Sequence, residues 1–502
     1  MTWQSAAHAK FSVFLISLRT FTHLQCDSRV DFSSDLETVE KITELKMEAK
    51  MWLVVVYCLV GISQSIVLGS PNLAVAPLSR IAFGSCANQS APQPIWDAIS
   101  RFNPHLFIWL GDNIYADEKL AAKIIGKERT VGPWKNTQRF LPVSDKEMKF
   151  KYDQAKTNPG YAWLRSKTQV IGTWDDHDYG LNDAGKEYPN KAISQKLMLD
   201  FLDEASNSPR RKQAGVYASY LFGPVGKQIK VILLDTRYHR DSLFSNGEML
   251  GETQWTWLEK ELKGNGAQIT IIASSIQVVS NFSAVVQPLF HVESWTHFPK
   301  ERDRLFKLIA DSNQTGVIFI SGDIHFGEIT RYDCGVGYPL YDITSSGLTQ
   351  AVEYAVPPSM SFLVRVAALL TPSTMRVFGK HCRYKSCVYV SGKPNFGAIQ
   401  IDWNANPVVI KVEVRDVHGE PVMDAHILLS ELQNGVLRKT NLKVGEIRHH
   451  CSLEMDLPWR VRYRLAATFY GMIAVILFLA LALLVVLAMA VYKFFLQKAK
   501  TE

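Results

Sequence analysis

Three apolar segments of this chain each end in a cluster of acidic side chains. The clusters are Asp112-Asn-Ile-Tyr115-Ala-Asp117, Asp175-Asp176-His177-Asp178 and Asp323-Ile-His325. Each is preceded by a run of Ile, Val, Leu and Phe, which is typical of a strand buried on both faces. In α/β folds, ligands gather just beyond the carboxyl ends of such strands. Like charges brought together there repel unless cations lie between them, so the pattern predicts a metal site.

A fourth strand end adds a thiol to this set. The apolar residues 80–83 run into Gly84-Ser-Cys86, and Tyr115 lies three residues after Asp112. Taken singly, a Gly-Asp pair at a strand end is more often a turn than a ligand, because both residues suit turns. A Cys, a Tyr, several Asp and two His at the ends of buried strands need partners, because burying unpaired polar groups is costly. The joint pattern favours the metal site.

The elements that must position these side chains alternate between strands and helices. The strand at 80–83, a helix opened by Pro94 and the strand that leads to Asp112 predict a β-α-β unit, and the polar segment 119–160 predicts an insertion over the site. Later helices are expected near 189–204, 253–262 and 299–310, and strands near 216–222, 230–234, 269–274, 397–403, 408–414 and 425–432. The order predicts an α/β domain at 78–435, with two mixed β-sheets packed as a sandwich and flanked by helices.

Composition and charge narrow the class of protein. Of the 502 residues, 47% are hydrophobic and 21% are charged, and the net charge is +7. Lys and Arg are scattered, so no nucleic-acid-binding surface is expected. Residues 465–492 carry no charged side chain, which predicts a transmembrane helix after a juxtamembrane linker at 436–464. The alternative is a buried core helix, but few core helices are apolar all round for so long.

The amino-terminal segment has the order of a secretory signal peptide. Within residues 47–70, Lys50 precedes an apolar run that small residues follow. Residues 1–46 form an extension ahead of it. Two alternatives stay open: translation begins at Met47 or Met51, or the segment remains as an uncleaved anchor.

Two further features indicate the compartment. Asn88, Asn281 and Asn313 lie in Asn-x-Ser/Thr sequons, which agrees with a secretory route. The cytosolic tail expected at 493–502 carries Lys498 and Lys500, whose spacing from the end resembles a dilysine retrieval signal; a solvated charge pair is the alternative. We expect a single-pass type I membrane protein of the secretory pathway, with its large domain in the lumen of the endoplasmic reticulum.

The cysteine count singles out one thiol. Of seven cysteines, Cys26 and Cys58 precede the large domain and five remain. In an oxidising lumen an odd number leaves one thiol unpaired, and Cys86 is the candidate because it follows a buried strand. The connectivity of the other four stays open: Cys334, Cys382, Cys387 and Cys451.

In order along the chain, these motifs resemble the PhoD-like alkaline phosphatases, a branch of the calcineurin-like metallophosphoesterases. The resemblance covers about residues 81–432 and suggests a membrane-anchored member of eukaryotic type. It rests on Gly84-Ser-Cys86, Gly111-Asp112-Asn-Ile-Tyr115, Trp174-Asp-Asp-His-Asp178 with Asn182, Leu234-Asp-Thr-Arg237 and Gly322-Asp323-Ile-His325-Phe326. Cys86 stands where the wider superfamily has a His, Asp176 where it has an Asn, and Asp323 where it has another His.

The resemblance implies a centre of two or more metals, Fe³⁺ with Ca²⁺, and other divalent ions in place of Ca²⁺ stay open. Thiolate and phenolate donors beside carboxylates suit a trivalent iron, while Asp and Asn oxygens suit a hard cation such as calcium. Asp112 is expected to bridge the metals, with Cys86, Tyr115 and Asp323 on the iron side. Asp176 and Asn182 are expected to face the divalent ion, and His325 completes the ligand set.

The implied reaction is hydrolysis of a phosphate ester by in-line attack of a metal-bound hydroxide. His177 is expected to contact the phosphate or protonate the leaving group, and Arg237 to hold the phosphate. The alternatives are a buried hydrogen-bonded His and an Arg in a structural ion pair. Asp117, Asp175 and Asp178 are expected to orient ligands, while Trp295, Pro299, Glu301 and Arg302 are expected to pack.

Two classes of function therefore stay open. The favoured one is a phosphoric ester hydrolase, a phosphomonoesterase or phosphodiesterase, because every motif position holds a chemically competent side chain. The other is a catalytically inactive, membrane-anchored module, stabilised by metal, that recognises a partner. Neither the natural substrate nor the oligomeric state follows from these residues.

Overall fold

The computed structural model describes residues 76–119, 140–243, 247–264, 266–280, 282–286, 292–355, 377, 393–436, 450–451, 453 and 458–501. The amino-terminal extension and the signal peptide predicted at 47–70 lie outside these residues. So do the sequon residue Asn281 and two of the cysteines, Cys382 and Cys387.

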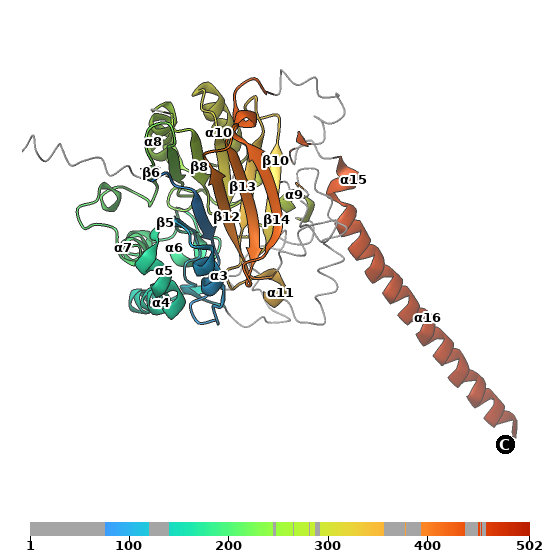
Figure 1. The fold of residues 1–502 in the computed structure, drawn as a ribbon. Coiled ribbons are helices and arrows are strands. Elements are labelled where there is room, and N and C mark those ends of the chain that lie inside the picture. Colours follow the sequence, from blue (N-terminus) through green and yellow to red (C-terminus); the bar gives the residue numbers. More distant parts are fainter. Residues whose placement is uncertain are drawn as a thin grey trace, which may run out of the picture. The chain divides into compact units, whose positions relative to one another are not determined.

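Two six-stranded sheets form the domain (Figure 1). The first has the order β14-β13-β12-β1-β2-β5, in which β1, β2 and β5 are parallel neighbours and β12 to β14 are antiparallel. Its strands are β1 (Arg80–Gly84), β2 (Leu106–Leu110), β5 (Gln169–Thr173), β12 (Asn395–Asp402), β13 (Val409–Asp416) and β14 (Pro421–Leu428). The strands predicted near 408–414 and 425–432 correspond to β13 and β14, which pair antiparallel.

The second sheet has the order β10-β11-β9-β8-β7-β6. Its strands are β6 (Ala218–Phe222), β7 (Ile229–Leu233), β8 (Ile269–Ala273), β9 (Val317–Ser321), β10 (Gly327–Tyr332) and β11 (Leu340–Ser345). The strands expected near 216–222 and 230–234 are β6 and β7, which pair antiparallel. β10 and β11 were not expected from the sequence, although β11 lies between β10 and β9 and extends the sheet next to Asp323.

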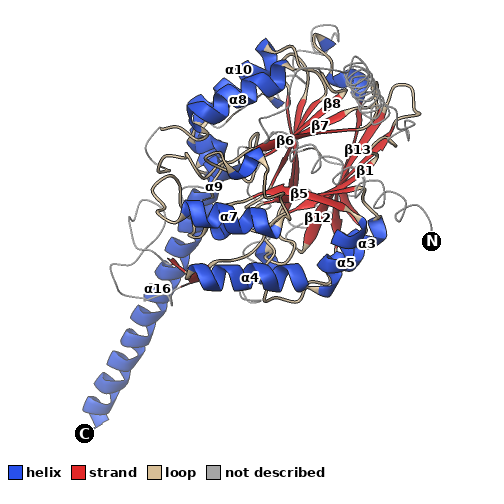
Figure 2. Ribbon diagram, turned by 90° about the vertical axis from the view of Figure 1, so that its left-hand side faces the viewer, coloured by secondary structure: helices blue, strands red, loops and turns tan. Residues whose placement is uncertain are grey.

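Alternation along the strands of the first sheet separates two apolar layers. In β2, Leu106, Ile108 and Leu110 pack into a core shared with β7, β8 and β9, while Phe107 and Trp109 pack on the other face. A side-chain period of two sends successive residues of a strand to opposite faces. The predicted sandwich of two mixed sheets flanked by helices is confirmed, and Figure 2 shows the helices outside it.

Helices cover both sandwich faces, and those of the first sheet complete its outer apolar layer. Where the sequence predicted a polar insertion, the structure has the short pair β3 (Asp117–Lys119) and β4 (Phe140–Pro142) followed by two helices whose apolar residues are sparse. The helices of the domain are α3 (Ile95–Phe102), α4 (Asp145–Thr157), α5 (Pro159–Lys167), α6 (Asp176–Tyr179), α7 (Lys191–Phe201), α8 (Gly251–Lys263), α9 (Phe282–Val286), α10 (Pro299–Asp311) and α11 (Val352–Ala355).

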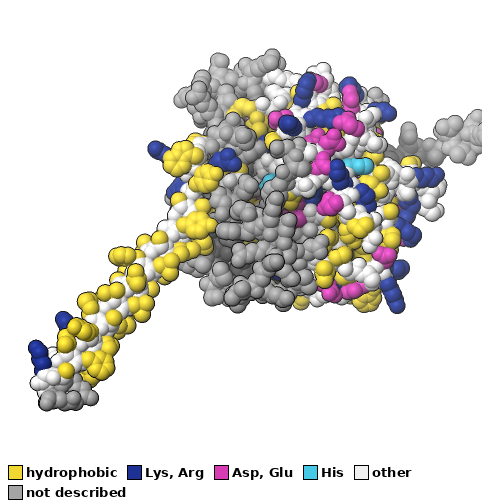
Figure 3. Space-filling model, turned by 180° about the vertical axis from the view of Figure 1, so that it is seen from behind, with side chains coloured by type: hydrophobic (Ala, Val, Ile, Leu, Met, Phe, Trp, Pro, Cys, Tyr) yellow, Lys and Arg dark blue, Asp and Glu magenta, His cyan; other side chains and the backbone are white. Residues whose placement is uncertain are grey.

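The carboxyl-terminal part contains α15 (Trp459–Arg462) and α16 (Arg464–Thr501). Among the described residues, α16 is the one helix whose length and apolar composition would allow it to cross a membrane. Figure 3 shows apolar side chains along it and basic ones near both ends. Ahead of α15, Cys451 forms a disulfide with Cys334, while Cys86 is buried and free. Among the cysteines that the structure describes, Cys86 is thus the unpaired one, as the cysteine count led us to expect.

Candidate metal centre

The candidate site lies where β1, β2, β5 and β9 end. The first three are parallel neighbours, so their carboxyl ends share one edge of the first sheet. The turns after β2 and β5 approach closely at Gly111, whose φ is +104°. A Cβ atom there would lie 2.5 Å from Cβ of Asp175, so only glycine allows this approach. The close packing brings Asp112 beside the cluster that follows β5.

Four of the predicted ligands have a backbone conformation that L-amino acids seldom adopt. The φ angle is 62° at Cys86, 49° at Asp112, 69° at Asp323 and 60° at His325. Non-glycine residues in this left-handed region cost energy and cluster at functional sites, where the surrounding structure holds them. The three turns that carry these four residues, after β1, β2 and β9, are therefore a candidate functional site on backbone geometry alone.

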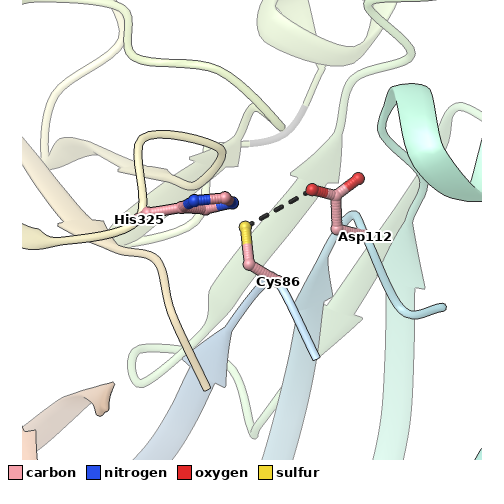
Figure 4. A group of neighbouring side chains, drawn as sticks. All are labelled: Cys86, Asp112 and His325. Atoms are coloured by element: carbon pink, nitrogen blue, oxygen red, sulfur yellow. Dashed lines mark hydrogen bonds between the residues drawn. The ribbon is translucent and has the colours of Figure 1, made fainter. Parts of the chain in front are cut away.

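Cys86, Asp112 and His325 form one group of potential ligands, with donor atoms all within 4.8 Å of one another. In Figure 4 the thiol of Cys86 points toward the carboxyl group of Asp112, and the ring of His325 lies beside them. Sγ of Cys86 is 3.4 Å from Oδ2 of Asp112, and the hydroxyl of Tyr115 is 3.2 Å from Nε2 of His325. The structure thus brings together the four residues after β1, β2 and β9 that could hold one metal ion.

Asp112 also belongs to a group of four carboxyl groups, of which three are buried and that of Asp323 is partly exposed. Its oxygen atoms lie within 4.8 Å of ligand atoms of Asp175, Asp176 and Asp323. Burial raises the pKa of Asp112 well above its ordinary value, and the neighbouring Cys86 adds to this effect. Burial and the charge of Asp175 likewise raise the pKa of Asp323. Asp112 thus joins the thiol side of the site to the carboxylate side, which is where a bridging ligand would lie.

His177 is held by a carboxylate on one side of the site. Its Nδ1 lies 2.7 Å from Oδ1 of Asp117, and its backbone N–H donates to Asp112. Burial would lower the pKa of His177, but Asp176 and Asp112 together with the hydrogen bond to Asp117 raise it well above its ordinary value. The ring packs on Tyr115, with centroids 4.3 Å apart. The neighbouring carboxylates therefore fix the position of the His177 ring beside the ligand cluster and favour its protonated form.

Arg237 lies beneath the carboxylates and is fully buried. Its Nε and Nη2 atoms contact Oδ1 of Asp175 at 2.6 and 2.5 Å, and its Nη1 donates to Glu293 at 2.8 Å. The carboxylates of Asp175 and Glu293 thus take up the hydrogen-bond donors of the planar guanidinium group of Arg237. This is the geometry of an Arg in a structural ion pair, the alternative named in the sequence analysis. Its proposed contact with phosphate stays a prediction.

Asp175 and Asp178 accept hydrogen bonds from the loops around the ligand cluster, and their role in orienting the ligands stays a prediction. Asp178 accepts hydrogen bonds from the backbone N–H groups of Asp112, Asn113 and Asp175. Ser275 donates to Asp175 at 2.6 Å, and its own backbone carbonyl accepts from Gly322, next to Asp323. The loops after β2, β5 and β9 are therefore linked by hydrogen bonds behind the ligand atoms.

Asn182 was expected to bind the divalent ion. Its backbone N–H donates to Asp117 at 2.9 Å, and the role of its side chain as a ligand stays a prediction. Its neighbour Asp183 lies with Asp176 and Glu293 in a further group that could hold a cation. The sequence analysis identified neither Asp183 nor Glu293 as a possible ligand. Asp183 could have been found from its place beside Asn182 after the Asp176 cluster. Glu293 follows no apolar strand and gives no such signal.

The donor set fits metal ions. Burial raises the pKa of Cys86 to about 12 and lowers that of His325 to about 4, so without a cation the thiol is protonated and the imidazole neutral. Oδ2 of Asp175 is buried and meets no hydrogen-bond donor within the described ranges. A cation would favour the thiolate and compensate the buried carboxylates. Thiol, phenol, imidazole and carboxyl groups can thus serve one polynuclear centre.

Four other residues of the predicted pattern lie away from the ligand cluster. Glu301 accepts from Trp255 Nε1 at 3.0 Å and from two backbone N–H groups, and Trp295 donates to Ser274 at 3.0 Å. Both residues are buried, as Arg302 is, and Pro299 begins α10. These contacts are those of packing residues, as the sequence favoured.

Comparison with known proteins gives one consistent family. The model of the PhoD-like phosphatases matches residues 81–405. Alkaline phosphatase D of Bacillus subtilis (strain 168) is 23% identical over 282 residues, which cover 50% of this chain and 46% of that protein. The chain thus spans about half the length of this relative. A solved structure described as PhoD has a TM-score of 0.51 and 16% identity, and the match covers 71% of this chain and 69% of that one. This chain belongs to the PhoD-like phosphatase family.

Proposed function

We propose that this chain is a metal-dependent phosphoric ester hydrolase that acts on phosphomonoesters or phosphodiesters. The observation that carries the proposal is the position of Asp112, whose carboxyl group lies among the thiol group, the imidazole group and three further carboxyl groups. A buried cluster of this kind is costly without cations, and two cations side by side suit phosphoryl chemistry. Membership of the family makes the same reaction class the first candidate.

Iron and calcium are the proposed ions. Cys86, Tyr115, Asp323 and His325 would hold Fe³⁺, and Asp112 would bridge it to Ca²⁺ held by Asp176 and Asn182. When bound, such ions supply Lewis acidity and a nucleophile at neutral pH. Asp183 and Glu293 extend the carboxylate side, so a larger centre also suits these residues.

His177 is the proposed proton donor to the leaving group. Asp117 fixes Nδ1 of the ring, and the carboxylates of Asp176 and Asp112 favour its protonated form. A positioned imidazolium of this kind contributes to leaving-group departure without binding a metal. Arg237 is proposed to act at the phosphate site through its ion pair with Asp175, whose position it holds.

The variant His177→Ala tests this role. We expect kcat to fall by about 10²- to 10³-fold, because a positioned proton donor is lost, while the metal content is unchanged. His239→Ala is the matched control, since His239 contacts the backbone of Ala214 rather than the ligand cluster. Unchanged kinetics in His177→Ala would leave the alternative of a buried structural histidine.

For location, we propose a single-pass type I membrane protein of eukaryotic type, with the domain in the lumen of the endoplasmic reticulum. The support is the apolar helix α16, the sequons and the signal-like segment at 47–70. Basic residues lie on both sides of the uncharged stretch 465–492 within α16, so the positive-inside rule does not decide the orientation.

Protease treatment of intact microsomes tests the orientation. A lumenal domain is shielded by the membrane, so we expect the domain to survive while a tag placed after Glu502 is digested. We also expect glycosidase treatment to shift the electrophoretic mobility of the protein. Digestion of the domain outside intact microsomes contradicts the assignment, and detergent-opened microsomes serve as the control.

A further inference from the structure

The segment after β11 contacts the candidate site, although no motif in the sequence points to it. Backbone N–H groups of Gly347 and Leu348 donate to the carbonyl of Ser85, and those of Thr349 and Gln350 donate to the carbonyl of Cys86. The N–H of Ser346 donates to the carbonyl of Phe326, in the loop that carries His325. The segment at 346–350 therefore joins the thiol turn to the histidine loop.

The hydroxyl of Ser346 lies between these two loops. Its Oγ is 2.7 Å from the backbone nitrogen of His325 and 3.0 Å from Sγ of Cys86, and the residue is fully buried. The N–H of His325 can only donate, so it makes Oγ an acceptor and leaves the hydroxyl hydrogen for another partner. Sγ of Cys86 is the neighbouring atom that can accept this hydrogen.

We propose that Ser346 is a positioning residue that donates a hydrogen bond to the metal-bound thiolate of Cys86 and holds the His325 loop to it. The inference rests on the proposed function, in which Cys86 is a ligand. A hydrogen bond to a thiolate withdraws electron density from the metal–sulfur bond, and such partners tune metal sites through their ligands. The hydroxyl thus sets the strength of this bond without touching the metal.

Two nearby serines give a graded comparison. Ser85 places its hydroxyl 3.3 Å from Sγ, farther away than Ser346 does, and 3.5 Å from the backbone carbonyl of Ser345, to which it can also donate. Ser345 is equally buried, but its hydroxyl donates to Asn395 at 2.9 Å. The effect of removing a hydroxyl is therefore expected to be largest at Ser346, smaller at Ser85 and absent at Ser345.

Cobalt(II) is the probe, because its sulfur-to-metal charge-transfer absorption reports the bond directly. The full-length protein is stripped with a chelator and reloaded with Co²⁺. In Ser346→Ala we expect this band to move to longer wavelength, because the thiolate becomes a stronger donor. We also expect Co²⁺ to be lost to a chelator about tenfold faster, because the His325 loop is no longer held to Cys86. Ser346→Thr restores the hydroxyl and is expected to restore both values, while Ser345→Ala leaves them unchanged.

The proposal is overturned if the band of Ser346→Ala coincides with that of Ser345→Ala. Should Ser346→Ala fail to fold, Ser346→Gly also removes the hydroxyl and must move the band to longer wavelength, and an unmoved band there rejects the idea. Cys86→Ser separates this inference from the proposed function. Its band must vanish if Cys86 is a ligand, and a persistent band refutes the ligand assignment itself.

Discussion

Replacing Asp112 with asparagine is expected to lower kcat/KM by at least about 10³-fold and to remove most bound metal. Asparagine keeps the shape of the side chain but replaces a charged oxygen between two groups of ligands. Loss of one bridging carboxylate removes several kcal/mol of charge stabilisation, which corresponds to a factor of this size. Phosphate release and elemental analysis on the same preparation measure both effects. Asp323→Asn is expected to behave in the same way.

The metal-free form of Asp112→Asn should nevertheless fold. Without cations the wild-type carboxyl group lies buried beside Cys86, Asp175 and Asp176, and its replacement by a neutral amide relieves repulsion. Asp333→Asn is a matched control, because Asp333 is buried but pairs with Arg331 near the disulfide. Full metal loading and unaltered kinetics in Asp112→Asn would show that the site is elsewhere.

The metal-free protein is expected to lose stability as the pH rises from about 4 to 8. Burial raises the pKa of Asp175 and Asp183 to about 7 and that of Asp178 to about 8, so these groups bind more protons in the folded than in the unfolded state over this interval. Stability falls with pH wherever the folded state binds more protons. Asp176 acts in the opposite direction, because His177 and Arg237 offset its burial and lower its pKa to about 2.

Thermal unfolding in detergent, followed by tryptophan fluorescence, measures this dependence. With chelator we expect Tm at pH 8 to lie on the order of 10 °C below Tm at pH 5, given several raised carboxyl pKa values. Bound metal compensates the charge of the carboxylates, so Tm should depend less on pH when metal is bound. The increase in Tm that metal causes should therefore grow as the pH rises. Curves of Tm against pH that coincide with and without chelator contradict a buried metal cluster.

Much of the site could be predicted because its ligands follow apolar strands. The runs before Asp112 and Asp323 are β2 and β9, and every residue of both strands is buried. A strand buried on both faces leaves its carboxyl end as the place where polar side chains can gather. Cys86 and the cluster after β5 follow the same rule.

Other contributors could not be found this way. Glu293 and Ser346 reach the site from segments whose local sequence is unremarkable, and only the sandwich brings them beside Arg237 and Cys86. The helices α4 and α5 were hidden in a polar segment, because their buried faces are only a few residues wide. Local pattern identifies the ends of elements, whereas contacts across the sandwich depend on tertiary packing.

The central claim is that this buried cluster is a metal centre that hydrolyses phosphate esters. The most direct test measures metal content by mass spectrometry, and turnover on a paired phosphomonoester and phosphodiester, in one preparation of the purified full-length protein. We predict bound iron and calcium, hydrolysis of at least one substrate, and loss of that activity with chelator. A metal-loaded protein that turns over neither ester would indicate a recognition module, and an active protein without bound metal would contradict the account.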